Sequence, residues 1–246
     1  MRRFFVPPEF IADGRAVITG DLFRHMAKVV RLKSGDHVLL ADGTGNEFSG
    51  VVREVERERL VVTLEERSAV KRTPVGPAIS IYQGLPKGDK LDLILQKTTE
   101  LGVAEIIPFP AARSVPRIRK GEETDKVARW QRIAREAARQ SGRAAAPTVR
   151  LAGGMAEIVR DARQSLKLIL WEEEELNGLR ETLARSETPE SIAVIVGPEG
   201  GLTAEEAALA KESGFIPVSL GRRILRTETA GLAVIAILQF IWGDVG

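Results

Sequence analysis

Two segments rich in glycine and arginine carry the residue types best suited to hold a ligand and act on it. The first is Gly197-Pro198-Glu199-Gly200-Gly201-Leu202-Thr203, which follows an apolar run and in which Thr203 and Glu206 have the spacing of a helix capping box. Glycines in such a strand-to-helix turn let the backbone approach a ligand closely. Two unit charges about 4 Å apart interact by roughly 4 kcal/mol at an effective dielectric of about 20, so Glu199 favours a neutral or cationic ligand over a polyphosphate. In the alternative, the segment is a tight turn and Glu199 hydrogen-bonds the amides of its own helix.

The second segment is SLGRRILRTETAG at 219–231, which joins an apolar run to the last helical stretch. Leu220, Ile224 and Leu225 are suited to form apolar walls around a flat heterocycle, with Arg226 and Glu228 facing the reaction. In the alternative, this is a solvated loop in which Arg226 and Glu228 form a surface ion pair.

The scarce residues exclude several kinds of chemistry. The chain has no cysteine, which removes thiolate nucleophiles, cysteine-bound zinc and iron-sulfur clusters. Its two histidines, His25 and His37, lie in neither an H-E-x-x-H nor a G-x-S-x-G setting, which argues against zinc or triad hydrolysis. GLPKGDK at 84–90 lacks the Walker A spacing, and no G-x-G-x-x-G occurs. We expect chemistry that needs no metal.

The net charge of +2 conceals an uneven distribution, because residues 113–143 hold ten basic and four acidic residues. Within this stretch Arg129, Arg132, Arg139 and Arg143 recur at helical spacing, while Val127, Trp130, Ala134 and Ala138 take another face. The near absence of acidic partners favours contact with phosphates, and a solvated helix face is the alternative. With 5% aromatic residues, recognition would depend on charge and shape, plus one extruded base.

Hydrophobic periodicity predicts two kinds of architecture along the chain. Residues 1–72 indicate a small antiparallel barrel with one short helix at 21–30 and a turn at 42–46, and 71–77 has the composition of a linker. The barrel strands are expected at 4–6, 16–19, 37–41, 47–55 and 60–64. From residue 79 onward, apolar strands alternate with helices, which predicts an α/β domain with a mostly parallel sheet covered on both faces. Its strands are expected at 79–83, 105–109, 166–171, 192–196, 216–220 and near 148–151, and its helices at 90–101, 124–141, 155–164, 177–186, 203–213 and 228–242. Ligands of such domains bind at the carboxyl ends of the strands, where both segments fall.

The last helix is apolar nearly all round, which is typical of a helix buried in the core or between subunits, and we expect a homodimer contact. Its longest apolar run, 230–242, is shorter than the roughly 20 residues that span a bilayer. The first ten residues, MRRFFVPPEF, do not have the pattern of a signal peptide. We expect a cytoplasmic protein without a membrane partner.

Taken together, GPEGGLT at 197–203 and SLGRRILRTETAGLAV at 219–234 resemble the SPOUT methyltransferases. More closely, the chain resembles the bacterial family that methylates N3 of a uridine in 16S ribosomal RNA. QKTTELGVAEIIPF at 96–109, Arg113-Ser114 and the start MRRFFV extend the resemblance over essentially the whole chain.

The resemblance implies a PUA-like, RNA-binding barrel at 1–72 and a SPOUT domain with a deep trefoil knot at 73–246. The pattern alone predicts an unknotted sheet, because chains rarely thread their own loops. The resemblance further implies S-adenosylmethionine as methyl donor, an obligate homodimer, and 16S ribosomal RNA or the small ribosomal subunit as partner. The implied donor pocket consists of Leu170, Trp171, Gly197, Pro198, Glu199, Gly200, Gly201, Leu220, Gly221, Ile224 and Leu225. Trp171 and the acidic run 172–175 depart from the expected pattern.

Uridine N3 must lose its proton as it takes the methyl group, so the reaction needs a base or a stabiliser of the anion. We expect Arg226 to stabilise negative charge on a uracil oxygen, and Glu228 to position Arg226 or accept the proton. The expected RNA contacts are Arg3, Arg31, Lys87, Arg113, Arg139 and Arg143. Two alternatives are a non-catalytic, RNA-binding ribosome assembly factor with the same fold and a nucleotide-dependent enzyme, which the missing phosphate loop disfavours.

Overall fold

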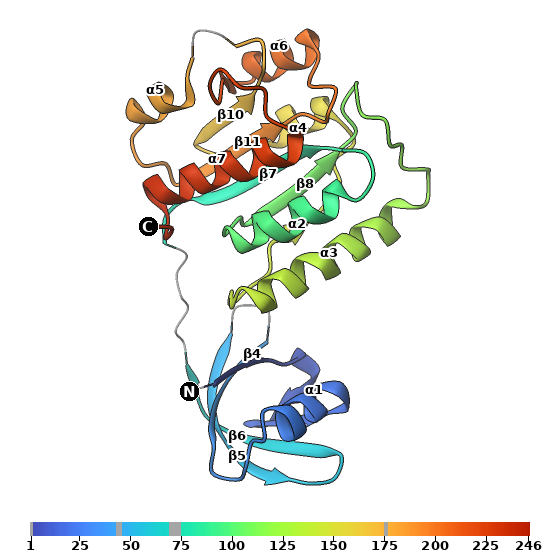
Figure 1. The fold of residues 1–246 in the computed structure, drawn as a ribbon, viewed down its shortest axis with the longest axis vertical. Helices are drawn as coiled ribbons and strands as arrows, with labels where there is room; N and C mark the ends of the chain where they lie inside the picture. The colour runs from blue at the N-terminus through green and yellow to red at the C-terminus, as the bar shows by residue number, and fades with distance from the viewer. Residues whose placement is uncertain (1, 43–45, 69–74, 175–176) are drawn as a thin grey trace. The chain divides into compact units, whose positions relative to one another are not determined.

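A computed structural model describes residues 2–42, 46–68, 75–174 and 177–246 (Figure 1). The chain divides into two compact units: residues 1–73 together with 138–146, and residues 74–137 together with 147–246. The central residues of the turn expected at 42–46, and most of the linker expected at 71–77, lie outside the described residues.

The first unit contains a six-stranded sheet with the order β1-β4-β5-β6-β3-β2. Its strands are β1 (Arg2–Phe5), β2 (Ile11–Ala12), β3 (Arg15–Thr19), β4 (His37–Ala41), β5 (Glu47–Val55) and β6 (Arg59–Ser68). Its helices are η1 (Pro8–Phe10), α1 (Gly20–Arg24) and the π-helical turn η2 (His25–Val29). The core between them includes Ile18, Met26, Leu40 and Leu60, each fully buried.

All five expected strands of this unit are present, but the all-antiparallel prediction was wrong at β1. That strand runs parallel to β4, with Arg2 opposite Val38 and Phe5 opposite Ala41. Two strands joined by a hairpin must be antiparallel, whereas the long segment between β1 and β4, which includes α1 and η2, provides the crossover that a parallel pair needs. The helix expected at 21–30 is present as α1 followed by η2.

The second unit contains six parallel strands in the order β12-β10-β11-β7-β8-β9. They are β7 (Ala78–Gly84), β8 (Glu105–Phe109), β9 (Thr148–Val149), β10 (Leu166–Leu170), β11 (Ser191–Val196) and β12 (Ile216–Val218). The helices are α2 (Lys90–Glu100), α3 (Glu123–Gln140), α4 (Met155–Asp161), α5 (Leu179–Ala184), α6 (Ala204–Glu212) and α7 (Thr227–Trp242). The predicted α/β class with a parallel sheet is confirmed.

Helices cover both faces of this parallel sheet (Figure 1). One face packs against α2, α3, α5 and α7, and its core includes Ile81, Val194, Trp130 and Leu238. The other face packs against α4 and α6. Because both faces are covered, β11 is apolar along its length rather than alternating, and all four residues from Ile192 to Ile195 are fully buried.

The register of the parallel strands places the two segments of interest at one edge of the sheet. Val196, the last residue of β11, lies opposite Gln83 of β7, and Gly84 lies opposite Phe109 of β8. The turn that follows β11 therefore begins beside the end of β7. Among the described residues, no helix is long and apolar enough to cross a membrane.

Candidate active site

The glycine turn, residues 197–203, connects β11 to α6 and is held in one shape by its own contacts. The predicted capping box is confirmed: the Glu206 amide donates to Thr203 Oγ1 at 3.2 Å, and the Thr203 amide donates to Glu206 Oε2 at 3.0 Å. Gly201 has a φ of +70°, and a Cβ atom there would lie 2.2 Å from Oε1 of Glu172. The position therefore requires glycine, and the segment after β10 contacts the turn.

The turn also packs directly on the end of β7. A Cβ atom at Gly84 would lie 2.6 Å from Cδ and 2.8 Å from the backbone nitrogen of Pro198. Because Gly84 has no side chain, the end of β7 can lie directly against the glycine turn that follows the neighbouring strand β11.

A buried polar network lies beneath the glycine turn. Thr227 Oγ1 donates to the carbonyl of Gly197 at 2.5 Å, and Gln83 Nε2 donates to Thr227 Oγ1 at 2.9 Å and to the carbonyl of Gly84 at 3.0 Å. Gln83 is fully buried and Thr227 is 5% exposed. Such bonds are strong in a low-dielectric interior, so the network joins the ends of β7 and β11 to the start of α7.

Sequence reasoning missed Gln83, although a signal was present. A glutamine at the end of the apolar strand AISIYQG is a polar residue at a position that must be buried, and buried polar side chains need partners. Its Nε2 atom finds them, whereas Gln83 Oε1 has no hydrogen-bond partner among the residues described.

Lys90, in the first turn of α2, was also missed, and it corrects the expectation for Glu199. Lys90 Nζ lies 2.7 Å from Glu199 Oε1 and 3.9 Å from Glu228 Oε2, and the Lys87 amide donates to Glu199 at 3.0 Å. Burial raises the pKa of Glu199, but the hydrogen bonds from Lys90, from the amide of Glu199 itself and from the Lys87 amide outweigh it and hold that pKa below its usual value. Because Lys90 balances this carboxylate, its charge does not exclude a polyphosphate. The Lys87 amide, which donates to Glu199, lies in the loop after β7 and not in the helix that follows Glu199, as the alternative held.

The arginine loop, residues 219–226, follows β12 and is tied to its neighbours at its start. The Ser219 amide donates to the carbonyl of Asn177 at 2.9 Å, the Leu179 amide to the carbonyl of Ser219 at 3.0 Å, and the Trp171 amide to the carbonyl of Val218 at 3.3 Å. These bonds bring the ends of β10 and β12 together. With the contact between Glu172 and Gly201, the three segments of the expected donor pocket meet at one edge of the sheet.

The rest of the arginine loop is open. Ile224 is 90% exposed, while Leu170, Trp171, Leu220 and Leu225 are partly buried. Arg226 is exposed, and in the described part of the chain its guanidinium has no hydrogen-bond or ion-pair partner. Glu228 is 14% exposed at its side chain and lies near Lys90, so the surface pair of Arg226 with Glu228 is not formed.

The expected RNA contacts differ in their surroundings. In the first unit, Arg3 forms an ion pair with Glu47, donates to the carbonyl of Gly142 and lies 5.0 Å from the ring centroid of Phe5. Arg3 therefore has partners within its own unit, and its assignment to RNA stays a prediction. Arg31 and Arg139 are exposed, and Arg143 is partly buried.

In the second unit, the Lys87 side chain is exposed, and Arg113 Nη1 donates to the carbonyl of Gly200 at 3.0 Å. On α3, Arg132 and Arg135 are exposed, whereas Arg129 forms an ion pair with Asp92 of α2. The described residues contain no group of three or more acidic or histidine side chains that could hold a metal ion.

Both units of the chain match family models of RNA methyltransferases. Residues 71–239 match the family model of an RNA methyltransferase domain, and residues 18–65 match that of an RNA methyltransferase PUA domain. The chain is therefore an RNA methyltransferase by family.

The relatives identify the family more closely. Ribosomal RNA small subunit methyltransferase E of Bacillus subtilis is 33% identical over 91% of this chain and 89% of its own length. The protein of the same name from Synechocystis is 33% identical over 95% and 76% of the two chains. The solved structure of ribosomal RNA small subunit methyltransferase E from Neisseria gonorrhoeae, bound to S-adenosyl methionine, covers 100% of both chains at 32% identity with a TM-score of 0.81. This chain belongs to the ribosomal RNA small subunit methyltransferase E family, which confirms the resemblance to SPOUT methyltransferases.

Proposed function

We propose that this protein transfers the methyl group of S-adenosylmethionine to N3 of a specific uridine in 16S ribosomal RNA. Family membership supports RNA methylation of the small subunit. The observation that supports this proposal is that three loops meet at the carboxyl edge of the parallel sheet. Arg226 is exposed there, and Glu228 follows it at the start of α7. A ribosomal RNA substrate places the protein in the cytoplasm, and as in its family we propose a trefoil knot in the second unit.

The residues at this edge fit S-adenosylmethionine. The glycine turn offers backbone with no Cβ atoms, and Leu220, Leu225 and the 90% exposed Ile224 offer apolar surface for an adenine ring. We assign the donor to these residues together with Leu170, Trp171, Gly197, Pro198, Glu199, Gly200, Gly201 and Gly221. Bound there, S-adenosylmethionine supplies a methyl group activated by a sulfonium.

The chain's own residues orient the uridine and manage its charge. The guanidinium of Arg226 is free to donate to a uracil oxygen, where negative charge develops once N3 loses its proton. The Glu228 side chain is 14% exposed and its Oε2 accepts no hydrogen bond among the described residues, so we propose that this carboxylate accepts the proton that N3 loses. Gln83, Thr227 and Lys90 hold the surrounding loops in place, which raises the fraction of encounters with reactive geometry.

The reaction is tested by incubating the protein with labelled S-adenosylmethionine and either 16S ribosomal RNA or assembled small subunits, then identifying the nucleoside by mass spectrometry. We expect 3-methyluridine at one position. Label in a different nucleoside would overturn the assignment to N3. Binding of donor and RNA without transfer would instead support the assembly-factor alternative.

We propose that residues 1–72 and the basic residues of α3 bind the RNA around the target. The proposed contacts are Arg31, Lys87, Arg113, Arg139 and Arg143, with Arg132 and Arg135 added because both are exposed. Each phosphate neutralised should contribute about −0.7 to −0.9 to the slope of log affinity against log salt. We expect the double substitution Arg132→Gln/Arg135→Gln to make this slope shallower by roughly 1.5. An unchanged slope would remove these two residues from the interface.

We also propose a homodimer that uses the outer face of α7. The inner face of this helix, with Val234, Ile235 and Leu238, is fully buried in the core, but Phe240 on the outer face is 71% exposed and Ile241 is 45% exposed. Large apolar side chains exposed on one helix face indicate an interaction site. Phe240→Glu should convert the dimer to a monomer in light scattering. Gln239, which is only 5% exposed, lies on the buried side of the helix, and this substitution leaves that side unchanged. A wild-type protein that is monomeric at micromolar concentration would contradict the proposal.

A further inference from the structure

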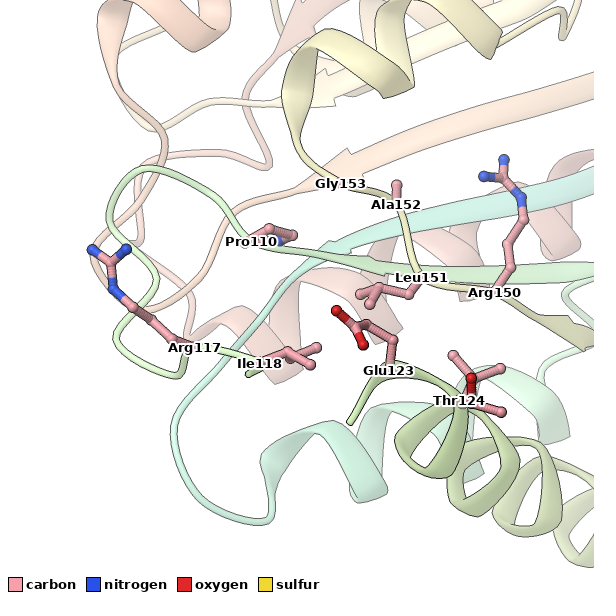
Figure 2. Close-up of a pocket in the computed structure, with 10 residues that line it drawn as sticks. Pro110, Arg117, Ile118, Glu123, Thr124, Arg150, Leu151, Ala152 and Gly153 are labelled. Carbon is pink, nitrogen blue, oxygen red and sulfur yellow. The ribbon is translucent and has the colours of Figure 1, made fainter. Parts of the chain in front are cut away.

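A cavity of about 740 Å³ lies at the carboxyl ends of β8 and β9, away from the proposed donor residues (Figure 2). Its volume is within the range of about 300–1,000 Å³ that is typical of small-molecule sites. Ile118, Val127 and Leu151 supply apolar surface. Glu123, at the start of α3, lies between Ile118 and Leu151 in Figure 2. None of the residues assigned to the donor or to catalysis lines this cavity.

One loop joins the cavity to the active site. We call residues 110–122 the basic loop, since it contains Arg113, Arg117, Arg119 and Lys120 and no acidic residue before Glu122. Near its start, the Ala112 amide donates to Glu206 Oε1 at 2.9 Å and Arg113 donates to the carbonyl of Gly200 at 3.0 Å. Further along, Arg117 and Ile118 line the cavity. The same loop therefore borders the glycine turn and walls the cavity, within one unit of the protein.

The polar groups of the cavity are of two kinds. Glu123 is partly buried and can only accept hydrogen bonds when ionised; it takes one at Oε2 from the Gly121 amide at 2.6 Å, which leaves acceptor capacity on both oxygens. Arg150 also lines the cavity, but its Nε atom donates to Glu105 at 2.7 Å. Arg117 lines the cavity, and Arg119 and Lys120 follow it in the basic loop; all three are exposed, and their side chains have no ion-pair partner among the described residues. A ligand that suits the cavity has a flat apolar ring for the apolar surface and hydrogen-bond donors on the ring edge that faces Glu123. It also carries a negative charge that can reach the exposed basic side chains.

We propose that this cavity binds a second, unpaired nucleotide of the RNA, whose base carries an amino group that donates to Glu123. Guanine fits best, because its N1–H and N2–H₂ groups are adjacent donors that match a carboxylate. Uracil fits worst, since its single N3–H donor is flanked by two carbonyl oxygens that a carboxylate repels. The phosphate of this nucleotide would lie at Arg117, Arg119 or Lys120. The proposal rests on the proposed function, as it takes RNA to be the substrate, and it adds a site that selects the nucleotide context of the target.

The experiment measures binding without methyl donor, so that its outcome is separate from that of the methylation assay. Three fluorescein-labelled RNA decamers serve as probes in anisotropy titrations: uridine throughout, the same with one central guanosine, and the same with inosine, which lacks the amino group, in that place. We expect the guanosine decamer to bind about 3- to 10-fold more tightly than the all-uridine decamer, with inosine in between. Equal dissociation constants for the three decamers would overturn the proposal.

Variants locate the preference in the cavity. Glu123→Gln should reduce the guanosine preference, and Ile118→Trp, which fills the cavity, should bring the dissociation constants of the guanosine and all-uridine decamers to the same value. Glu122→Gln is the matched control, because Glu122 forms an ion pair with Lys126 at 3.9 Å instead of lining the cavity. A preference retained in both Glu123→Gln and Ile118→Trp would place it elsewhere. Competition by free GMP as strong as that by the guanosine decamer would show a site for free nucleotide and would also overturn the proposal.

Discussion

The glycine turn and the arginine loop follow parallel strands of the same sheet and end at the same edge, but they differ in how they are held. The glycine turn is fixed by its capping box, by Thr227 bonded to Gly197, and by the Lys90–Glu199 ion pair. The arginine loop exposes Ile224 and the guanidinium of Arg226. Groups that are already fixed in place lose little conformational entropy when a ligand binds. Exposed groups lose more, because the ligand itself must order them. The glycine turn is thus preorganised before any ligand binds, whereas the exposed part of the arginine loop gains its partners only when a ligand binds.

The arginine loop predicts the largest effect. Arg226→Ala should lower the single-turnover rate of methylation by about 100-fold or more, the loss expected when one donor to a developing negative charge is removed. Affinity for S-adenosylmethionine should stay within about 2-fold, because Arg226 is not among the residues assigned to the donor. Calorimetry for the donor and quenched-flow methylation measure the two effects separately.

Arg223→Ala is the matched control, since Arg223 is an exposed arginine of the same loop, three residues earlier. It should retain a rate close to that of the wild type. Near wild-type turnover by Arg226→Ala would end its assignment as the stabiliser of the uracil anion, and an equal loss in both variants would indicate a general effect of loop charge.

The glycine turn predicts the next effect, and it falls on stability and donor binding together. Thr227→Val keeps the shape of the side chain but removes the bond to the Gly197 carbonyl and leaves Gln83 Nε2 with one partner fewer. An unsatisfied buried group costs about 1–3 kcal/mol, so the free energy of unfolding should fall by that amount and the donor should bind more weakly. Urea denaturation and donor calorimetry measure both.

Thr229→Val provides the comparison, because Thr229 is exposed two residues further along α7. A surface substitution of this kind should change stability by less than about 0.5 kcal/mol. If Thr227→Val and Thr229→Val changed the free energy of unfolding and the donor affinity equally, the buried network would not be what fixes the conformation of the glycine turn.

The contrast between the two loops also separates what the sequence predicts from what it does not. The strands and helices of the second unit were predicted, most within two residues at each end, because long apolar runs alternate there with helical periodicity. The capping box was predicted because Thr203 and Glu206 are local in sequence. Parallel pairing of β1 with β4 was not, since it depends on a crossover rather than on any pattern in β1 itself.

Partners distant in sequence were the other failure. Glu199 was expected to favour a neutral or cationic ligand or to hydrogen-bond the amides of its own helix, yet it pairs with Lys90, 109 residues away. Gln83 reaches Thr227 across 144 residues. Charge and polarity indicate that such groups need partners, but the identity of the partner follows from which strands are neighbours in the sheet, and local patterns do not contain that order.

The smallest effect concerns the charge that ties the glycine turn to α2. The pKa of Glu199 is lower in the folded protein than in the unfolded chain, so the carboxylate contributes stability above its unfolded pKa, and this contribution is lost as the pH falls through the folded pKa. Because the pair is partly exposed, the contribution at neutral pH should be at most about 1 kcal/mol.

Glu199→Gln should therefore be slightly less stable than wild type at pH 7 and should lose less stability on acidification below pH of about 5. Urea denaturation across this range, with Glu100→Gln of the Lys97–Glu100 pair as control, measures the difference. Identical pH slopes for wild type and Glu199→Gln would mean that hydrogen bonding by neutral groups, rather than this ion pair, makes the glycine turn the more rigid of the two loops.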